Sequence, residues 1–301
     1  MKLTQVRDFL AVAERGSLRA ASRHLGVPQP SITRSIQELE HDLGVPLFER
    51  SAQGVRLTPP GVAFRRRAVA VRNELQLARD EIEQLRGATH GSLTACMSSV
   101  PHLALLPSVL APFRRRYPDV RLHVIDAVYP TVEASLRDGT VDVYIGPTPD
   151  EVATDLRREL LFENTRVILG RTGHPLAKAR SLAELVDAEW LTTSITARPE
   201  EELGPLFAQH GLPAPRLVMR AQSSLTFLVA MAYSDVLMMV PIQWVRFPLW
   251  RNVLQPIHVR EPLPAPPICI VQRAGMPLTP AAEHFCDLVR RAAPHRRGPQ
   301  G

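Results

Sequence analysis

Residues 16–44, GSLRAASRHLGVPQPSITRSIQELEHDLG, carry two helical hydrophobic patterns with only a short turn between them. This spacing constrains the fold more than any other feature of the chain. Ser17 can cap the first helix and Gly26 can end it. At 100° per residue, one narrow stripe of the second helix holds Ile32, Ile36, Leu39 and Leu43. With an earlier amphipathic segment at residues 3–13, the pattern predicts three short helices on one small core, a helix-turn-helix.

The face of the third helix opposite this stripe is polar from its first residue onward. The segments LFER and VRLT then flank a turn at residues 51–54, which predicts a two-stranded wing. Wing arginines would meet phosphates or the minor groove beside a helix in the major groove. Any amphipathic helix pair shows similar stripes, but the order of helices and wing favours DNA binding. The predicted DNA-binding residues are Ser17, Gln29, Pro30, Thr33, Arg34, Gln37, Arg50 and Arg56.

The next segment, from Pro60 to Arg86, has apolar residues at alternating intervals of four and three, the a/d spacing of a coiled coil. The alternative is one amphipathic helix lying on its own domain, but its charged remaining surface favours a dimer. Two such units would read two half-sites of a roughly palindromic operator. The adjoining Arg65, Arg66 and Arg67 either assist near the DNA backbone or are simply solvated. The predicted dimerisation residues are Phe64, Ala68, Val71, Leu75, Ala78, Ile82 and Leu85.

From residue 91 the patterns alternate between strand and helix. GSLTACMS, VRLHVIDA and VDVYIG have strand character, whereas PHLALLPSVLAPFRRRYP and PTVEASLRDG have helix character. Parallel strands of this kind place ligand groups at their carboxyl ends and at the following helix N-termini, where anions are favoured. For each hydroxyl residue, a helix cap or turn is an equally good explanation. The candidate effector-binding residues are Ser98, Ser99, Tyr129, Thr131, Pro147, Thr148, Ser194 and Ser223.

FLAVAERGSLRAASRHLGVPQPSITRSIQELEHDLGVPLFER, followed by GVRLTPPG and a long helix, closely resembles the LysR-type transcriptional regulators. The resemblance implies an N-terminal winged helix-turn-helix with a long dimerisation helix. It also implies an α/β effector domain of two Rossmann-like lobes, similar to a periplasmic binding protein. The positions that touch DNA in this family are here Gln29, Pro30, Thr33, Arg34 and Arg50. In AYSDVLMMVP, where relatives often carry a glycine turn, Asp235 is expected to adopt the left-handed conformation.

We expect three parts: residues 1–58 as the DNA-binding domain, 59–88 as the dimerisation helix, and 89–301 as the effector-binding domain, with a disordered tail from about residue 294. The net charge of +6 makes an anionic partner plausible. The first residues have no signal-peptide pattern and no apolar run is long enough to span a membrane, so we expect a cytoplasmic protein without a membrane partner.

Motifs of enzymes and cofactor sites do not occur in the sequence, so we predict neither catalysis nor a cofactor or metal. The three cysteines, Cys96, Cys269 and Cys286, form no C-x-x-C pair, and Cys96 is either a redox sensor or a small core residue.

The sequence therefore predicts a homodimer, or a dimer of dimers, that binds double-stranded promoter DNA. The transcription machinery is a possible further partner. A small anionic inducer, such as an aromatic acid or sulfonate, would bind between the lobes and alter the oligomer geometry. The alternative is a small-molecule binding protein whose N-terminal unit serves protein assembly. A steep loss of DNA affinity with rising salt would separate the two.

Overall fold

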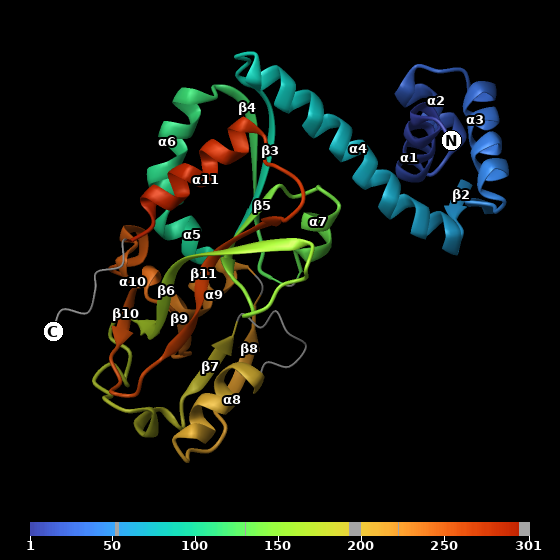
Figure 1. The fold of residues 1–301 in the computed structure, drawn as a ribbon. Helices are drawn as coiled ribbons and strands as arrows, with labels where there is room; N and C mark the ends of the chain where they lie inside the picture. The colour runs from blue at the N-terminus through green and yellow to red at the C-terminus, as the bar shows by residue number, and fades with distance from the viewer. Residues whose placement is uncertain (52–53, 130, 193–199, 222, 295–301) are drawn as a thin grey trace.

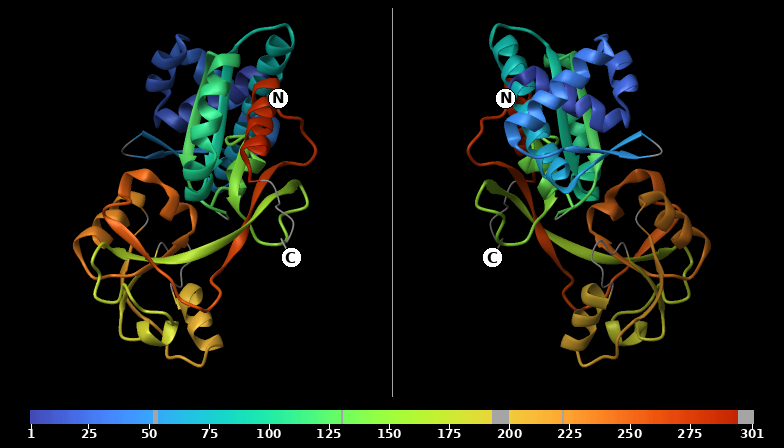
Figure 2. Two further views of the ribbon diagram at one scale, coloured as in Figure 1. Left: turned by 90° about the vertical axis from the view of Figure 1, so that its left-hand side faces the viewer. Right: turned by 90° about the vertical axis from the view of Figure 1, so that its right-hand side faces the viewer.

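The structure is a computed structural model that describes residues 1–51, 54–129, 131–192, 200–221 and 223–294. Figure 1 shows a helical N-terminal unit, a long helix leading away from it, and a C-terminal unit of two lobes. We call the lobe that adjoins the long helix lobe 1 and the lobe at the far end of the C-terminal unit lobe 2, as the two views in Figure 2 also show. Within the described residues, no helix has the length and apolar character needed to cross a membrane.

The N-terminal unit confirms the predicted helix-turn-helix and wing. Ser17 accepts a hydrogen bond from the Ala20 amide at 3.1 Å, and Gly26 ends the helix in the left-handed conformation. The core centres on Phe9, which is fully buried and whose ring lies 5.1 Å from that of Phe48. The elements are α1 (Leu3–Arg15), α2 (Leu18–Leu25), α3 (Gln29–Leu43), β1 (Phe48–Ser51) and β2 (Gly54–Leu57).

Two contacts fix the wing relative to the helices. The carboxylate of Glu40 on α3 accepts hydrogen bonds from the amides of Leu47 and Phe48, at 2.6 and 3.0 Å. Gly54 has a φ of 126°, and a Cβ atom there would collide with the carbonyl oxygen of Gly16. Only glycine fits this close approach without strain, so the wing is held against the start of α2.

Helix α4 (Pro59–Leu85) begins at Thr58, whose hydroxyl accepts from the Gly61 amide at 3.1 Å. Its first half belongs to the N-terminal core, because Ala68 is buried there and the ring of Phe64 lies 4.9 Å from that of Phe9. At these two positions the predicted dimerisation residues pack against their own unit. The other predicted dimerisation residues are exposed: Val71, Leu75, Ala78, Ile82 and Leu85.

Lobe 1 confirms the predicted alternation of strands and helices. Strand β3 pairs in parallel with β4 and β5, and β11 continues the sheet in antiparallel pairing with β5 and β6. The helix predicted over residues 101–118 is instead two helices that meet at Leu105, because Pro107 begins the second. The elements are β3 (His90–Met97), α5 (Ser99–Ala104), α6 (Leu106–Arg116), β4 (Asp119–Asp126), α7 (Glu133–Arg137), β5 (Val143–Pro147) and α11 (Pro280–Ala292).

Two long strands, β6 (Leu156–Arg171) and β11 (Pro264–Arg273), continue from lobe 1 into lobe 2. The pairing of β11 with β6 shifts register between Ala265 and Cys269, where the strands pass between the lobes. In lobe 2, β9 and β10 flank the second half of β6, and β7 pairs with β8. The remaining elements are η1 (Leu182–Leu185), β7 (Glu189–Thr192), α8 (Glu200–Gln209), β8 (Arg216–Arg220), α9 (Ser224–Tyr233), β9 (Met238–Pro241), α10 (Gln243–Arg246), η2 (Pro248–Trp250) and β10 (Leu254–Ile257).

The turn before β9 differs from the expectation for Asp235. No described non-glycine residue has a positive φ, so the predicted left-handed conformation is wrong. Arg171 Nε donates to the Asp235 carboxylate at 2.7 Å, and His174 Nε2 donates to its carbonyl oxygen at 2.9 Å. These contacts hold the turn in an ordinary backbone conformation.

Candidate functional site

The N-terminal half of α3 forms an exposed polar surface. Gln29, Pro30 and Gln37 are exposed, and the Arg34 side chain is 82% exposed. The Thr33 hydroxyl is half-buried and donates to the Gln29 carbonyl oxygen at 3.0 Å. The structure therefore brings the predicted residues of α3 to one surface, although Thr33 also bonds its own helix.

The other predicted DNA-binding residues lie around α3. Ser17 is half-buried and caps α2, so its hydroxyl oxygen is already used within the helix-turn-helix. Arg56 is exposed on strand β2 of the wing, and the side chain of Arg50 lies outside the described residues. The surface thus has a protruding helix flanked by a wing, a shape that fits the major groove and the adjacent backbone.

A cavity of about 150 Å³ lies between the two lobes. Three predicted residues line it from lobe 1: Ser98, Ser99 and Pro147. The Ser98 hydroxyl is buried and has no hydrogen-bond partner among the described residues. The other polar groups of the wall are Asn164 and Arg166, both on β6.

Further groups from β6 and lobe 2, which the sequence did not single out, also line this pocket. Among them are Asn164, Arg166, Phe227, Met238, Met239 and Trp244. The apolar members lie inside two helices and a strand, where they look like ordinary core residues in the sequence. A charged residue preceding the apolar run VILG was the one local signal available, at Arg166.

Four of the other candidates, Tyr129, Thr131, Thr148 and Ser223, do not line this cavity. Tyr129 donates its hydroxyl hydrogen to Glu133 at 2.6 Å, and Thr131 donates to the Val128 carbonyl oxygen at 2.5 Å. Thr148 accepts from Arg158 Nε at 2.8 Å, and Ser223 stands at the N-cap position of α9. Tyr129 and Thr131 make the local bonds typical of turns and loops, whereas Thr148 bonds a side chain ten residues away. Ser194 lies outside the described residues, as does the tail after residue 294.

One buried hydroxyl joins two loops beside the pocket. The Tyr144 hydroxyl donates to the Pro147 carbonyl oxygen at 2.9 Å and accepts from the Tyr129 amide at 3.2 Å. Burial raises the pKa of the Tyr144 phenol, so the group stays protonated and remains a donor. The pocket wall at Pro147 is therefore fixed by a residue that does not line the pocket.

Comparison with known families decides what this two-part architecture is. The model described as "LysR substrate binding domain" matches residues 86–294. The model described as "Bacterial regulatory helix-turn-helix protein, lysR family" matches residues 3–62. The chain belongs to the LysR family. It is a LysR-type DNA-binding transcriptional regulator with an effector-binding domain, and not an enzyme. The alternative in which the N-terminal unit serves only protein assembly is therefore set aside.

Individual relatives agree with this assignment. The regulator is 27% identical over 297 residues to the uncharacterized HTH-type transcriptional regulator YdcI of Escherichia coli, covering 98% of this chain and 96% of YdcI. It is 38% identical over 151 residues to the HTH-type transcriptional regulator TfdS of Cupriavidus pinatubonensis, covering 48% of this chain and 50% of TfdS. Its fold is similar to that of full-length CbnR in complex with target DNA, with a TM-score of 0.71 at 24% identity, covering 97% of this chain and all of CbnR.

In this LysR-type regulator, polar contacts join the second half of α4 to lobe 1. Arg273 of β11 forms an ion pair with Glu74, and Asp80 accepts from the Ser92 amide at 3.1 Å. Gln84 accepts from the Ala281 amide at 2.9 Å at the start of α11. Asp142 lies close to this group and accepts from the Thr94 amide at 2.7 Å. Because desolvation outweighs the Arg273 charge, the pKa of Asp142 is raised to about 6, with Asp80 and Glu74 raising it further.

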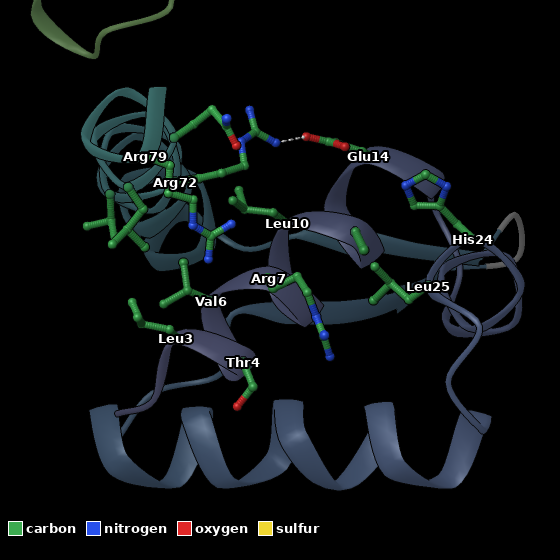
Figure 3. A pocket seen from close by; sticks show the side chains of 14 residues that line it. Leu3, Thr4, Val6, Arg7, Leu10, Glu14, His24, Leu25, Arg72 and Arg79 are labelled. Carbon is green, nitrogen blue, oxygen red and sulfur yellow. Dashed lines mark hydrogen bonds and ion pairs between the residues drawn. The ribbon is translucent and has the colours of Figure 1, made fainter. Parts of the chain in front are cut away.

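The regulator also has a groove of about 390 Å³ between α1 and α4, shown in Figure 3. Apolar side chains from both helices form its floor: Leu3, Val6, Leu10, Val71 and Leu75. Arg7, Arg72 and Arg79 lie along its edges, and Arg72 pairs with Glu14 across the groove at 2.6 Å. Two of the predicted dimerisation residues, Val71 and Leu75, thus form one side of an open apolar groove.

Cys96 is fully buried in lobe 1, and desolvation raises the pKa of its thiol to about 11. A thiolate is the reactive form of cysteine, so burial of this kind favours core packing over redox sensing.

Proposed function

We propose that this regulator binds its promoter as a homodimer, with one winged helix-turn-helix on each half-site. Gln29, Pro30, Arg34 and Gln37 would enter the major groove at the N-terminal end of α3, and Thr33 would lie beside them. Arg50 and Arg56 would contact the backbone from the wing, with Ser17 at the start of α2. The observation that carries this proposal is the 82% exposed Arg34 side chain on a helix whose opposite face buries Ile32, Ile36 and Leu39.

We further propose that the chain divides into a DNA-binding domain over residues 1–58, a dimerisation helix over 59–88 and an effector-binding domain over 89–301. We place the protein in the cytoplasm, where promoter DNA is accessible, with the transcription machinery as a further partner.

The dimer interface that we propose is the exposed side of α4 together with the groove in Figure 3. The exposed fractions of Val71, Leu75, Ile82 and Leu85 range from 39% to 68%. Apolar residues at this spacing on a charged helix favour pairing with a second apolar helix. A second copy of the same chain supplies one, and a dimer of dimers would require a further surface.

The effector that we propose is a small anion with an apolar body, such as a single-ring aromatic acid or sulfonate. Arg166 would contribute a positive charge, and the unsatisfied Ser98 hydroxyl would donate a hydrogen bond. Phe227 and Trp244 would contact the apolar body. A cavity of about 150 Å³ accommodates roughly one benzene ring, which limits the size of the body. Binding would shift the oligomer between arrangements according to its different affinity for each.

Tryptophan fluorescence tests the effector proposal, because Trp244 lines the pocket. Benzoate and benzenesulfonate are titrated into the wild-type protein and into Trp244→Phe and Ser98→Ala. We expect a saturable change in the wild type, its loss in Trp244→Phe and weaker binding in Ser98→Ala. A change of equal size in Trp244→Phe would place the ligand elsewhere, and no change with either probe would remove this ligand class.

A further inference from the structure

The guanidinium group of Arg34 has one partner among the described residues. Its Nε donates to Oε1 of Glu38, one helical turn further along α3, at 2.8 Å. An arginine carries five N–H donors, and this bond uses only the one on Nε. The two terminal nitrogens therefore remain available for a planar acceptor pair, which guanine presents in the major groove through O6 and N7.

Glu38 is itself held from outside its helix. Its second carboxylate oxygen lies 3.4 Å from Nε2 of Gln5 on α1, a long contact. Gln5 is buried, and its Oε1 accepts from the Lys2 amide at 2.7 Å. A chain of polar contacts thus runs from the start of α1 through Gln5 and Glu38 to Arg34.

We infer that Glu38 is a positioning residue for base recognition, which holds the Arg34 side chain in the conformer that reads DNA. This inference rests on the proposed contact between Arg34 and a base. An exposed ion pair contributes little to the stability of the free protein. Its effect is on binding, because a side chain already held in one conformer loses less freedom when the complex forms.

The charge of Glu38 acts in the opposite direction on DNA of arbitrary sequence. A carboxylate near the duplex repels phosphates, so it lowers the affinity for every sequence. Only a site that engages Arg34 gains from the positioning. Glu38 therefore increases the ratio of the affinity for the specific site to the affinity for unrelated DNA. Measuring the affinity for a specific and for an unrelated duplex separates the positioning of Arg34 from the repulsion of phosphates.

The test uses the full-length protein and a pool of random duplexes, from which the wild type selects its preferred site. Dissociation constants are then measured for that site, for each single-base variant of it and for an unrelated duplex. The proteins are wild type, Glu38→Ala, Glu38→Gln and Arg34→Ala. Asp42→Asn is the charge-matched control, because Asp42 lies at the far end of α3 and pairs with the N-terminal amino group at 3.0 Å.

We expect Glu38→Ala to lower discrimination at one base position by about 3- to 10-fold, the range expected for ordering one long side chain. Its affinity for unrelated DNA should stay equal or increase. Glu38→Gln keeps an acceptor for Arg34 Nε and should recover part of the discrimination, and Asp42→Asn should leave it unchanged. Arg34→Ala should abolish discrimination at the same position.

Three results with Glu38→Ala would overturn the inference. Glu38→Ala could weaken binding to all duplexes alike, which indicates a structural role. It could sharpen discrimination, which means that Glu38 withholds Arg34 from DNA. Glu38→Ala could also leave discrimination intact while Arg34→Ala abolishes discrimination. The contact of Arg34 with a base would then stand, but Glu38 would have no positioning role. If Arg34→Ala has no effect, both fall, and a wild type that selects no site contradicts the DNA-binding proposal itself.

Discussion

Replacing Asp142 with asparagine should stabilise the protein at neutral pH. The pKa of Asp142 rises from 3.8 to about 6, and one pKa unit corresponds to about 1.4 kcal/mol. Ionised Asp142 therefore lowers the free energy of unfolding by about 2–3 kcal/mol, where the lower value allows for partial contact of the carboxylate with water. A carboxyl with a higher pKa in the folded chain binds more protons when folded. The free energy of unfolding therefore falls as pH rises from about 4 to about 6. Asparagine removes this loss and can still accept from the Thr94 amide.

Urea unfolding of full-length wild type and Asp142→Asn, followed by circular dichroism between pH 4 and 7.5, measures the effect. The two free energies of unfolding should be similar at the acidic end and differ by about 2–3 kcal/mol above pH 6, with the variant more stable. Asp119→Asn is the control, because Asp119 is exposed and bonds the Thr89 hydroxyl. A variant less stable than the wild type at pH 7.5, or one with parallel pH dependence, would refute the argument.

Two further substitutions test the N-terminal unit and the dimer. Gly54→Ala should displace the wing from Gly16 and weaken DNA binding without lowering the unfolding midpoint of the effector-binding domain, and an unchanged affinity would contradict the role of this contact. Leu75→Asp combined with Ile82→Asp should give a monomer in sedimentation velocity, because each change puts a charge into the proposed apolar interface, and a dimeric double variant would place the interface elsewhere.

Local signals explain why the helix-turn-helix could be predicted closely. Ser17 and Gly26 mark helix ends through caps that involve only neighbouring residues, and both agree with the structure. The apolar period of α4 predicts a helix, but periodicity does not tell whether the apolar face meets a partner or its own domain. Phe64 and Ala68 face their own domain because α4 starts against α1.

The effector pocket could be predicted only in part because it is assembled from distant segments. Ser98 and Pro147 stand at the carboxyl ends of parallel strands, so their placement follows from a general rule of α/β sheets. Arg166 and Trp244 reach the same pocket only because β6 continues from one lobe into the other. That course depends on long-range strand pairing, which no local pattern reports.

Binding of the purified protein to the DNA flanking its own gene tests the central claim most directly. The measurement is a salt titration in the presence of an unrelated competing duplex. The account predicts tight and selective binding whose affinity falls steeply with salt, as phosphate neutralisation requires. Weak binding of equal strength to both duplexes would contradict it.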